Sequence, residues 1–138
     1  MSERTRRGTV MPCLTYRDAE AAMKWLTRAF GFEEKLVVPG DDKRPIAHAE
    51  MTLGDGMIML GSAYDDGFGK HLRSPAALGA VTASIYAVVP DPAAHHARAV
   101  EAGAEIVLPL HTKEYGTDYT ARDPEGHIWS FGDYDPFA

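Results

Sequence analysis

Apolar residues follow a helical period near the start of the chain. Four of them recur at the i, i+3, i+4, i+7 spacing that places side chains on one helical face: Ala22, Trp25, Leu26 and Ala29. This pattern predicts an amphipathic helix. Asp18 precedes it as a favourable N-cap residue, and Gly31 follows it as a stop signal.

Extended apolar segments surround this helix. The stretches 10–16 and 35–38 are typical of strands, and the stretches 46–53 and 57–60 flank Gly-Asp-Gly in the manner of a hairpin. Residues 62–79 are rich in Gly, Asp and Pro without a clear period, which predicts a long loop or linker.

The same order of elements then starts again. Asp91 and Pro92 provide an N-cap and a first-turn proline, and Gly103 ends the second predicted helix. The apolar face expected for this helix consists of Ala93, Ala97 and Val100. Strands are predicted around it at 81–89, 105–110, 119–122 and 127–131.

The two halves of the chain are an internal repeat. The offsets between matching residues are 73, 72 and 70 positions for the pairs Asp18 and Asp91, Gly31 and Gly103, and Gly56 and Gly126. Each half has the order strand, helix and three strands, which indicates duplication of one unit. We therefore expect one domain over 1–138, with modules at about 9–61 and 80–134 joined by the linker 62–79.

Composition narrows the classes of function. The 138 residues are 45% hydrophobic and 25% charged, which is typical of a globular protein. A net charge of −6 argues against a nucleic-acid partner, which requires a basic surface. No apolar run approaches the roughly 20 residues that span a bilayer. Cys13 is the single cysteine and has no intrachain disulfide partner, so a cytoplasmic location is expected.

Three segments together resemble the vicinal oxygen chelate superfamily, which includes glyoxalases, extradiol dioxygenases and bleomycin-resistance proteins. They are residues 13–33, 88–107 and 115–131, the last containing the turn Arg-Asp-Pro-Glu-Gly-His before an aromatic strand. The resemblance implies an α+β fold of two βαβββ modules, with curved mixed sheets around a cavity and the helices outside. It also implies a homodimer and, in the enzymes, a divalent metal in the cavity.

The resemblance also places four metal-ligand positions in the sequence. One lies seven residues before each helix-capping Asp, which gives Met11 and Ser84, and one lies four residues after each turn glycine, which gives Leu60 and Ser130. Zinc and similar cations require imidazole, carboxylate or thiolate donors. The four residues offer none of these, so the sequence predicts no metal and no cofactor at this place.

Other side chains carry chemistry of their own. Alternation places Cys13 with Met11, and Tyr86 with Ser84, on the face that lines the cavity, and a four-residue turn would place Tyr119 opposite Ser130. His48 and Glu50 share one face of a strand, either as a hydrogen-bonded pair or as part of a displaced metal site. His95 and His96 are expected to face solvent, since the predicted apolar stripe lies elsewhere.

These observations favour a metal-independent protein that binds a small, planar or aromatic molecule, as bleomycin-resistance proteins do. The alternatives are a glyoxalase-like lyase, isomerase or dioxygenase with a displaced metal, and a dimer without a ligand. The expected partners are a small molecule and a second copy of the chain, without nucleic acid or membrane. The expected ligand-binding residues are Met11, Cys13, His48, Leu60, Ser84, Tyr86, Tyr119 and Ser130.

Overall fold

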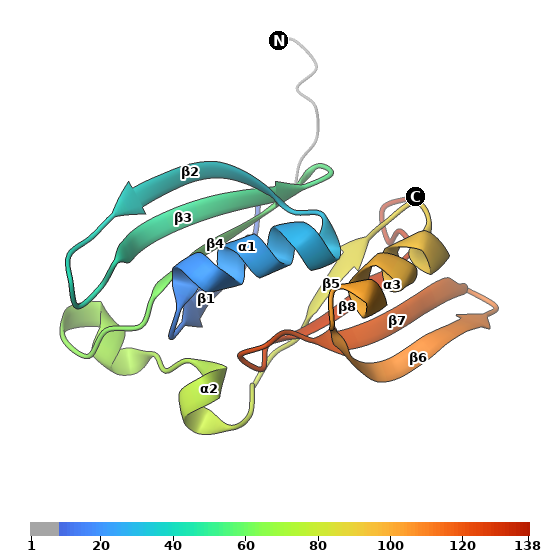
Figure 1. Cartoon of the computed structure of the whole chain (residues 1–138). Helices are drawn as coiled ribbons and strands as arrows, with labels where there is room; N and C mark the ends of the chain where they lie inside the picture. The colour runs from blue at the N-terminus through green and yellow to red at the C-terminus, as the bar shows by residue number, and fades with distance from the viewer. Residues whose placement is uncertain (1–8) are drawn as a thin grey trace, which may run out of the picture.

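The computed structural model describes residues 9–138 and contains the same series of elements twice (Figure 1). The first series consists of β1 (Cys13–Tyr16), α1 (Ala19–Phe30), β2 (Glu33–Pro39), β3 (Ile46–Leu53) and β4 (Gly56–Ser62). The second consists of β5 (Ile85–Val88), α3 (Pro92–Glu101), β6 (Glu105–Lys113), β7 (Gly116–Arg122) and β8 (Ile128–Gly132). The repeated order predicted from the sequence is confirmed.

The segment between the two series is more ordered than its composition indicates. It contains a 3-10 helix, η1 (Gly67–His71), and a single helical turn, α2 (Pro75–Leu78). The Ser74 side chain caps α2 by accepting a hydrogen bond from the backbone N–H of Ala77 at 3.3 Å. The linker therefore follows a defined path between the two halves.

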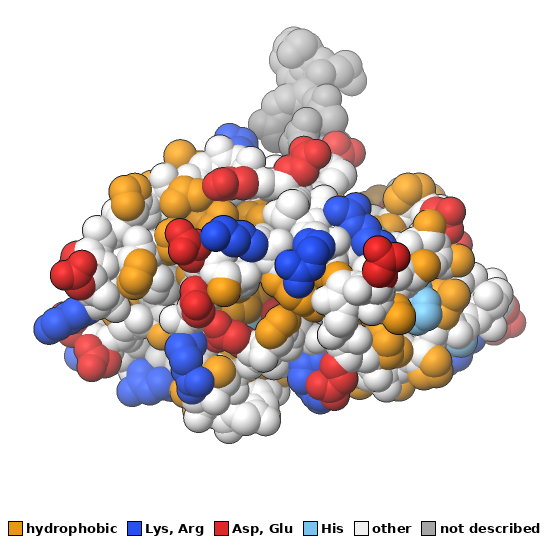
Figure 2. Space-filling model, in the orientation of Figure 1, with side chains coloured by type: hydrophobic (Ala, Val, Ile, Leu, Met, Phe, Trp, Pro, Cys, Tyr) orange, Lys and Arg blue, Asp and Glu red, His pale blue; other side chains and the backbone are white. Residues whose placement is uncertain are grey.

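Each half forms one four-stranded mixed sheet. The strand orders are β1-β4-β3-β2 and β5-β8-β7-β6, with the first pair parallel and the others antiparallel. In residues 9–138 the two sheets share no paired strands, so they do not close into one barrel. Helices α1 and α3 lie on the same side of the molecule (Figure 1), and acidic and basic side chains are interspersed on this side (Figure 2).

Helix α1 follows the sequence prediction. The Asp18 side chain accepts a hydrogen bond from the N–H of Ala21 at 3.0 Å, and Gly31 ends the helix with φ at +86°. The predicted apolar face is buried, together with Met23 and Phe30. The helix is thus fixed at both ends and along one face.

Helix α3 is rotated relative to the prediction. Its buried residues are Pro92 and Ala99. The predicted face is exposed instead: Ala93 and Ala97 face solvent, and Val100 is 48% exposed. The buried stripe packs against α1 and β7, so the neighbouring elements decide which face of a short, alanine-rich helix is covered.

Aromatic side chains fill the space where the two halves meet. Phe30 from α1 contacts Trp129 and Phe131 from β8, with ring centroids 5.6 and 4.6 Å apart. All three side chains are completely buried. Burial of apolar surface is the main favourable contribution to folding, and the burial of these aromatic rings also joins the two halves.

The turn between β7 and β8 has five residues, 123–127, rather than four. The N–H of Asp123 donates to the carbonyl of His127, and the Asp123 carboxylate accepts from the N–H groups of residues 125, 126 and 127. The extra residue shifts the strand register by one position. Thr120, and not Tyr119, consequently lies opposite Ser130, and the predicted pairing of Tyr119 with Ser130 is wrong.

Candidate functional site

Each sheet has one face covered by a helix and one face that we call the open face. In the first sheet, Ala49 and Met51 of β3 are fully buried on the helix side, whereas His48 and Glu50 alternate with them and are partly accessible. In the second sheet, Trp129 and Phe131 are buried and Ser130 lies between them on the open face. The open faces therefore carry the accessible side chains of both sheets.

Sequence reasoning placed Leu60 on the wrong face. Leu60 is 4% exposed and pairs in register with Leu14 and Ala49 on the helix side. Its neighbour Met59 occupies the open face opposite Cys13, as Ser130 does opposite Tyr86. The error arose because the turn glycines are not equivalent: the first hairpin turns on residues 54–55, and the second on residues 123–127.

Of the other expected residues, Cys13, His48, Tyr86 and Ser130 lie on the open faces. Met11 lies two residues before β1 and Ser84 directly precedes β5, and Cys13 is exposed beside Met59. Ser130 Oγ lies 2.7 Å from Thr120 Oγ1. One hydroxyl of this pair donates to the other, so one O–H remains available to a ligand.

Tyr86 lies on the second open face with its hydroxyl at the end of the sheet. The hydroxyl donates to the carbonyl of Tyr134 at 2.7 Å. Desolvation raises the pKa of Tyr86, and the carboxylates of Asp118 and Asp133 raise it further. Tyr86 therefore stays a neutral hydroxyl group at neutral pH.

Both open faces also carry a histidine paired with a carboxylate. His48 Nε2 lies 2.9 Å from Glu50 Oε2 in the first sheet, and His111 Nε2 lies 3.0 Å from Asp118 Oδ1 in the second. Sequence reasoning found the first pair from its i, i+2 spacing. It missed the second, because that pair forms between two strands that meet only in the folded sheet.

Tyr119 and His95 lie in the core between the two halves. Tyr119 is fully buried, and its hydroxyl donates to His95 Nδ1 at 2.6 Å, while His95 Nε2 donates to the carbonyl of Phe30 at 2.8 Å. Burial lowers the pKa of His95, and Arg98 lowers it further. His95 therefore does not face solvent, and Tyr119 does not line an open face.

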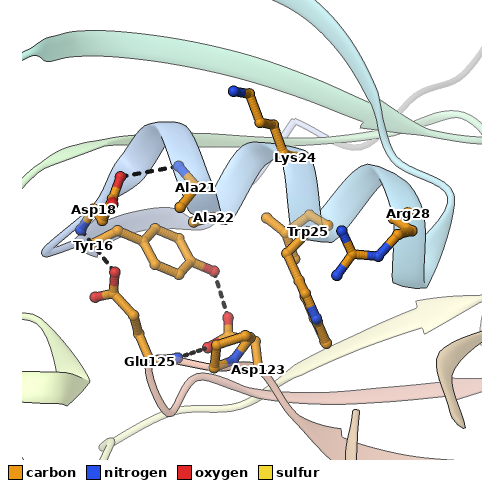
Figure 3. A pocket seen from close by; sticks show the side chains of 11 residues that line it. Tyr16, Asp18, Ala21, Ala22, Lys24, Trp25, Arg28, Asp123 and Glu125 are labelled. Atoms are coloured by element: carbon orange, nitrogen blue, oxygen red, sulfur yellow. Dashed lines mark hydrogen bonds between the residues drawn. The ribbon is translucent and has the colours of Figure 1, made fainter. Parts of the chain in front are cut away.

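A second set of polar contacts joins the halves at the start of α1 (Figure 3). The Tyr16 hydroxyl donates to Asp123 Oδ2 at 2.6 Å, and the Glu125 carboxylate accepts from the backbone N–H groups of Arg17 and Asp18 at 2.6 and 2.8 Å. The buried Asp123 also accepts from Trp129 Nε1. We call this set the turn contact. Its carboxylates are occupied by internal donors.

A hollow of about 380 Å³ lies beside the turn contact, between α1 and residues 123–125. A second hollow of about 490 Å³ shares Trp25 and residues 123–125 with the first and extends to α2. The second hollow also touches the start of β6 and the end of β7 through Glu105 and Arg122. The carboxylates Asp123 and Glu125, which line both hollows, hold the two halves together, which leaves the open faces as the better candidate for ligand chemistry.

Comparison with known proteins defines the family. The model described as the Glyoxalase/Bleomycin resistance protein/Dioxygenase superfamily matches residues 8–131. The chain belongs to this family. An uncharacterized protein of Mycobacterium bovis, Mb0911c, is 34% identical over 122 residues, which cover 88% of this chain and 80% of that protein.

Solved structures show the same fold. TioX from Micromonospora sp. ML1 has a TM-score of 0.72 and 32% identity, with coverage of 91% of this chain and 94% of TioX. The bleomycin-binding protein of Streptomyces verticillus, solved with copper(II)-bleomycin, has a TM-score of 0.61 and 20% identity, with coverage of 93% and 97%. The α+β fold of two βαβββ units is therefore shared with these proteins.

The corrected register changes one of the four metal-ligand positions that the family resemblance implies. After correction of the register, those places hold Met11, Met59, Ser84 and Ser130. Thioethers and neutral hydroxyls do not form a site for zinc or a similar cation. Within residues 9–138, no group of three or more His, Cys, Asp or Glu side chains is arranged to hold a metal ion.

No helix in the described part of the chain is both long and apolar enough to cross a membrane.

Proposed function

We propose that this protein binds a small, flat, aromatic molecule on its open faces without a metal and so sequesters it. The supporting observation is the character of those faces. Met11, Val38, Tyr86 and Val88 keep between 37% and 46% of their surface accessible. Apolar walls with a few hydroxyl groups are typical of small-molecule sites.

A homodimer is part of this proposal. An exposed apolar sheet face is unfavourable in water, and a second copy of the chain offers a matching face that covers it. A cavity between two open faces would hold a ligand more completely than one face alone. The fold shared with a bleomycin-binding protein supports this assignment, and protection against an antibiotic is the biological role that we propose.

The dimer can be tested with matched substitutions. Val38→Glu places a charge on the first open face, whereas Val100→Glu places the same charge on the exposed side of α3; the two valines are 41% and 48% exposed. We expect sedimentation to show a dimer for the native protein and for Val100→Glu, and a monomer for Val38→Glu. A native protein that stays monomeric at high micromolar concentration would contradict the dimer.

The binding site can be tested at Ser130. A leucine at this position fills space on the second open face, and added methylene groups in a packed site typically cost ~1–3 kcal/mol. We expect Ser130→Leu to weaken a ligand found by native mass spectrometry or screening, and Ala97→Leu, on the exposed side of α3, to leave its affinity unchanged. Calorimetry measures both. Equal affinities for the two variants would place the ligand elsewhere.

Metal independence has its own measurement. We expect elemental analysis of the purified protein to show no stoichiometric zinc, nickel, manganese or iron, because the open faces lack a donor set. One metal per chain, lost after His48→Ala, would instead support the enzyme alternative with a displaced site.

A further inference from the structure

Each open face carries a carboxylate whose partner is a histidine rather than a lysine or an arginine. Among residues 9–138, Glu50 and Asp118 pair with His48 and His111, and neither carboxylate lies within ion-pair distance of a lysine or an arginine. Their side chains are only 22% and 19% exposed. An imidazole supplies one hydrogen bond, so each carboxylate keeps free lone pairs.

Two apolar side chains flank Glu50 on the neighbouring strands. Its cross-strand neighbours are Leu36 on β2 and Met59 on β4. Thioether sulfur packs well against aromatic rings. A carboxylate in such surroundings attracts a cation more strongly than one in open water, because the local dielectric constant is lower.

Asp118 lies near the hydroxyl end of the Tyr86 side chain. A Cβ atom placed on Gly132 would lie 2.7 Å from Tyr86 Oη and 2.8 Å from Asp118 Cβ, so Tyr86 and Asp118 approach each other over this glycine. Any side chain at Gly132 would separate them. A carboxylate beside an aromatic ring is a favourable environment for an ammonium or guanidinium group, through ion pairing and cation–π attraction.

The two carboxylates lie on equivalent strands but two positions apart, because Glu50 pairs with Met59 as Thr120 pairs with Ser130. Both lie on the third strand of their sheets, β3 and β7, and both point to the open face. When the first open face of one copy covers the second open face of its partner, Glu50 and Asp118 contribute to one cavity. A nearby charged pair, Arg122 with Glu105, is neutral and adds no net charge.

We propose that the ligand is an organic cation, a flat aromatic ring system that carries an amine or guanidine group. This inference rests on the proposed function. The cationic group lies between Tyr86 and Asp118 or beside Glu50, and the ring packs on Met59 and Leu36.

Three tricyclic dyes of similar shape test the charge. Proflavine is cationic, acridone is neutral and acridine-9-carboxylate is anionic, and fluorescence titration measures the affinity of each. We expect proflavine to bind at least about tenfold more tightly than acridine-9-carboxylate, because a charge-assisted contact contributes a factor of this order. Added salt should weaken proflavine and leave acridone unchanged.

Charge-removing variants locate the effect. Glu50→Gln and Asp118→Asn keep the shape of the side chain, and each should weaken proflavine about tenfold without changing acridone. Glu101→Gln, at the exposed end of α3, is the control and should change neither dye. Melting temperatures close to that of the native protein would show that the variants are folded.

The outcomes separate the cation inference from the proposed function. Equal binding of acridone and proflavine, or variants that behave like Glu101→Gln, would overturn the cation inference while leaving an aromatic-binding site in place. Binding of another small molecule that is sensitive to Ser130→Leu, with none of the dyes bound, would do the same. Failure of all dyes and of the screen would overturn both proposals.

Discussion

The Asp123→Asn substitution changes one oxygen of a buried carboxylate into a hydrogen-bond donor. Asp123 is 3% exposed and accepts five hydrogen bonds: three from the backbone of its own turn, one from the Tyr16 hydroxyl and one from Trp129 Nε1. In the variant, the retained oxygen can still serve the turn. The new amide group then faces Tyr16 and Trp129.

The two lost bonds have different consequences. The Tyr16 hydroxyl can rotate and accept from the amide, so it loses mainly the contribution of the negative charge. The Trp129 N–H can only donate, and it is left unsatisfied in the core at a cost of about 1–3 kcal/mol. A hydrogen bond to a charged group contributes about 1.5–3 kcal/mol. We therefore expect Asp123→Asn to lower the free energy of unfolding by about 3–5 kcal/mol.

Urea unfolding followed by tryptophan fluorescence measures this loss. Tyr16→Phe removes a single bond and should cost about 1.5–3 kcal/mol, and it remains informative if Asp123→Asn does not fold. Asp42→Asn, in an exposed turn, is the control and should stay within about 0.5 kcal/mol of the native protein. A loss below about 1 kcal/mol for Asp123→Asn would refute the account of the turn contact.

Three further predictions follow from the structure. The pKa of His95 is lower in the folded protein than in the unfolded chain, so on acidification the histidine is protonated in the unfolded chain first. The free energy of unfolding should therefore decrease as the pH falls below the unfolded-state pKa of about 6.5. The urea midpoint should drop less between pH 8 and pH 5 in His95→Gln than in the native protein or in His71→Gln, and an equal drop would contradict this role. Gly116→Ala should cost at least ~1 kcal/mol more than Gly67→Ala in urea unfolding, because its Cβ would overlap the Asp133 carboxylate at φ +148°, whereas the Cβ of Gly67 meets open space. Residues 62–79 should exchange amide hydrogens faster than the strands if they open over a ligand, and equally slow exchange would support a fixed linker.

The order of elements could be predicted because local signals agreed with one another. Asp18 and Gly31 mark the ends of α1, and Asp91 marks the start of α3, as the structure confirms. Such signals depend on the backbone near each residue, so one sequence is enough to find them. The repeat added strength, since the same order of elements appears twice.

The strand register was harder to predict because one residue decides it. Whether His127 belongs to the turn or to the strand depends on its carbonyl, which accepts from Asp123. That choice determines whether Tyr119 or Thr120 faces the ligand side. A shift of one position exchanges the two faces of a strand, and the residue pattern did not reveal it because Tyr119, Thr120 and Ala121 are all buried.

The role of His95 depends on contacts across the whole chain. Its partners Phe30 and Tyr119 are 65 and 24 residues away. The neighbouring Arg98 donates to the carbonyls of Thr27 and Arg28 and so also holds the end of α1. The spacing of Pro92, His95 and Ala99 places them on one helical face and so indicates that His95 faces the core with them. An interpretation based on apolar residues alone does not detect this.

Cohesion between the halves does not depend on the segment that connects them. Seven hydrogen bonds in the described chain join residues 15–30 to residues 95–127, and none of the seven involves residues 62–79. A chain cleaved within that segment should therefore remain a two-fragment complex, and separately produced fragments should recombine. The entropy of closing a loop rises only slowly with its length, so insertions there should be tolerated. The connecting segment is thus the natural place for a label or a fused domain.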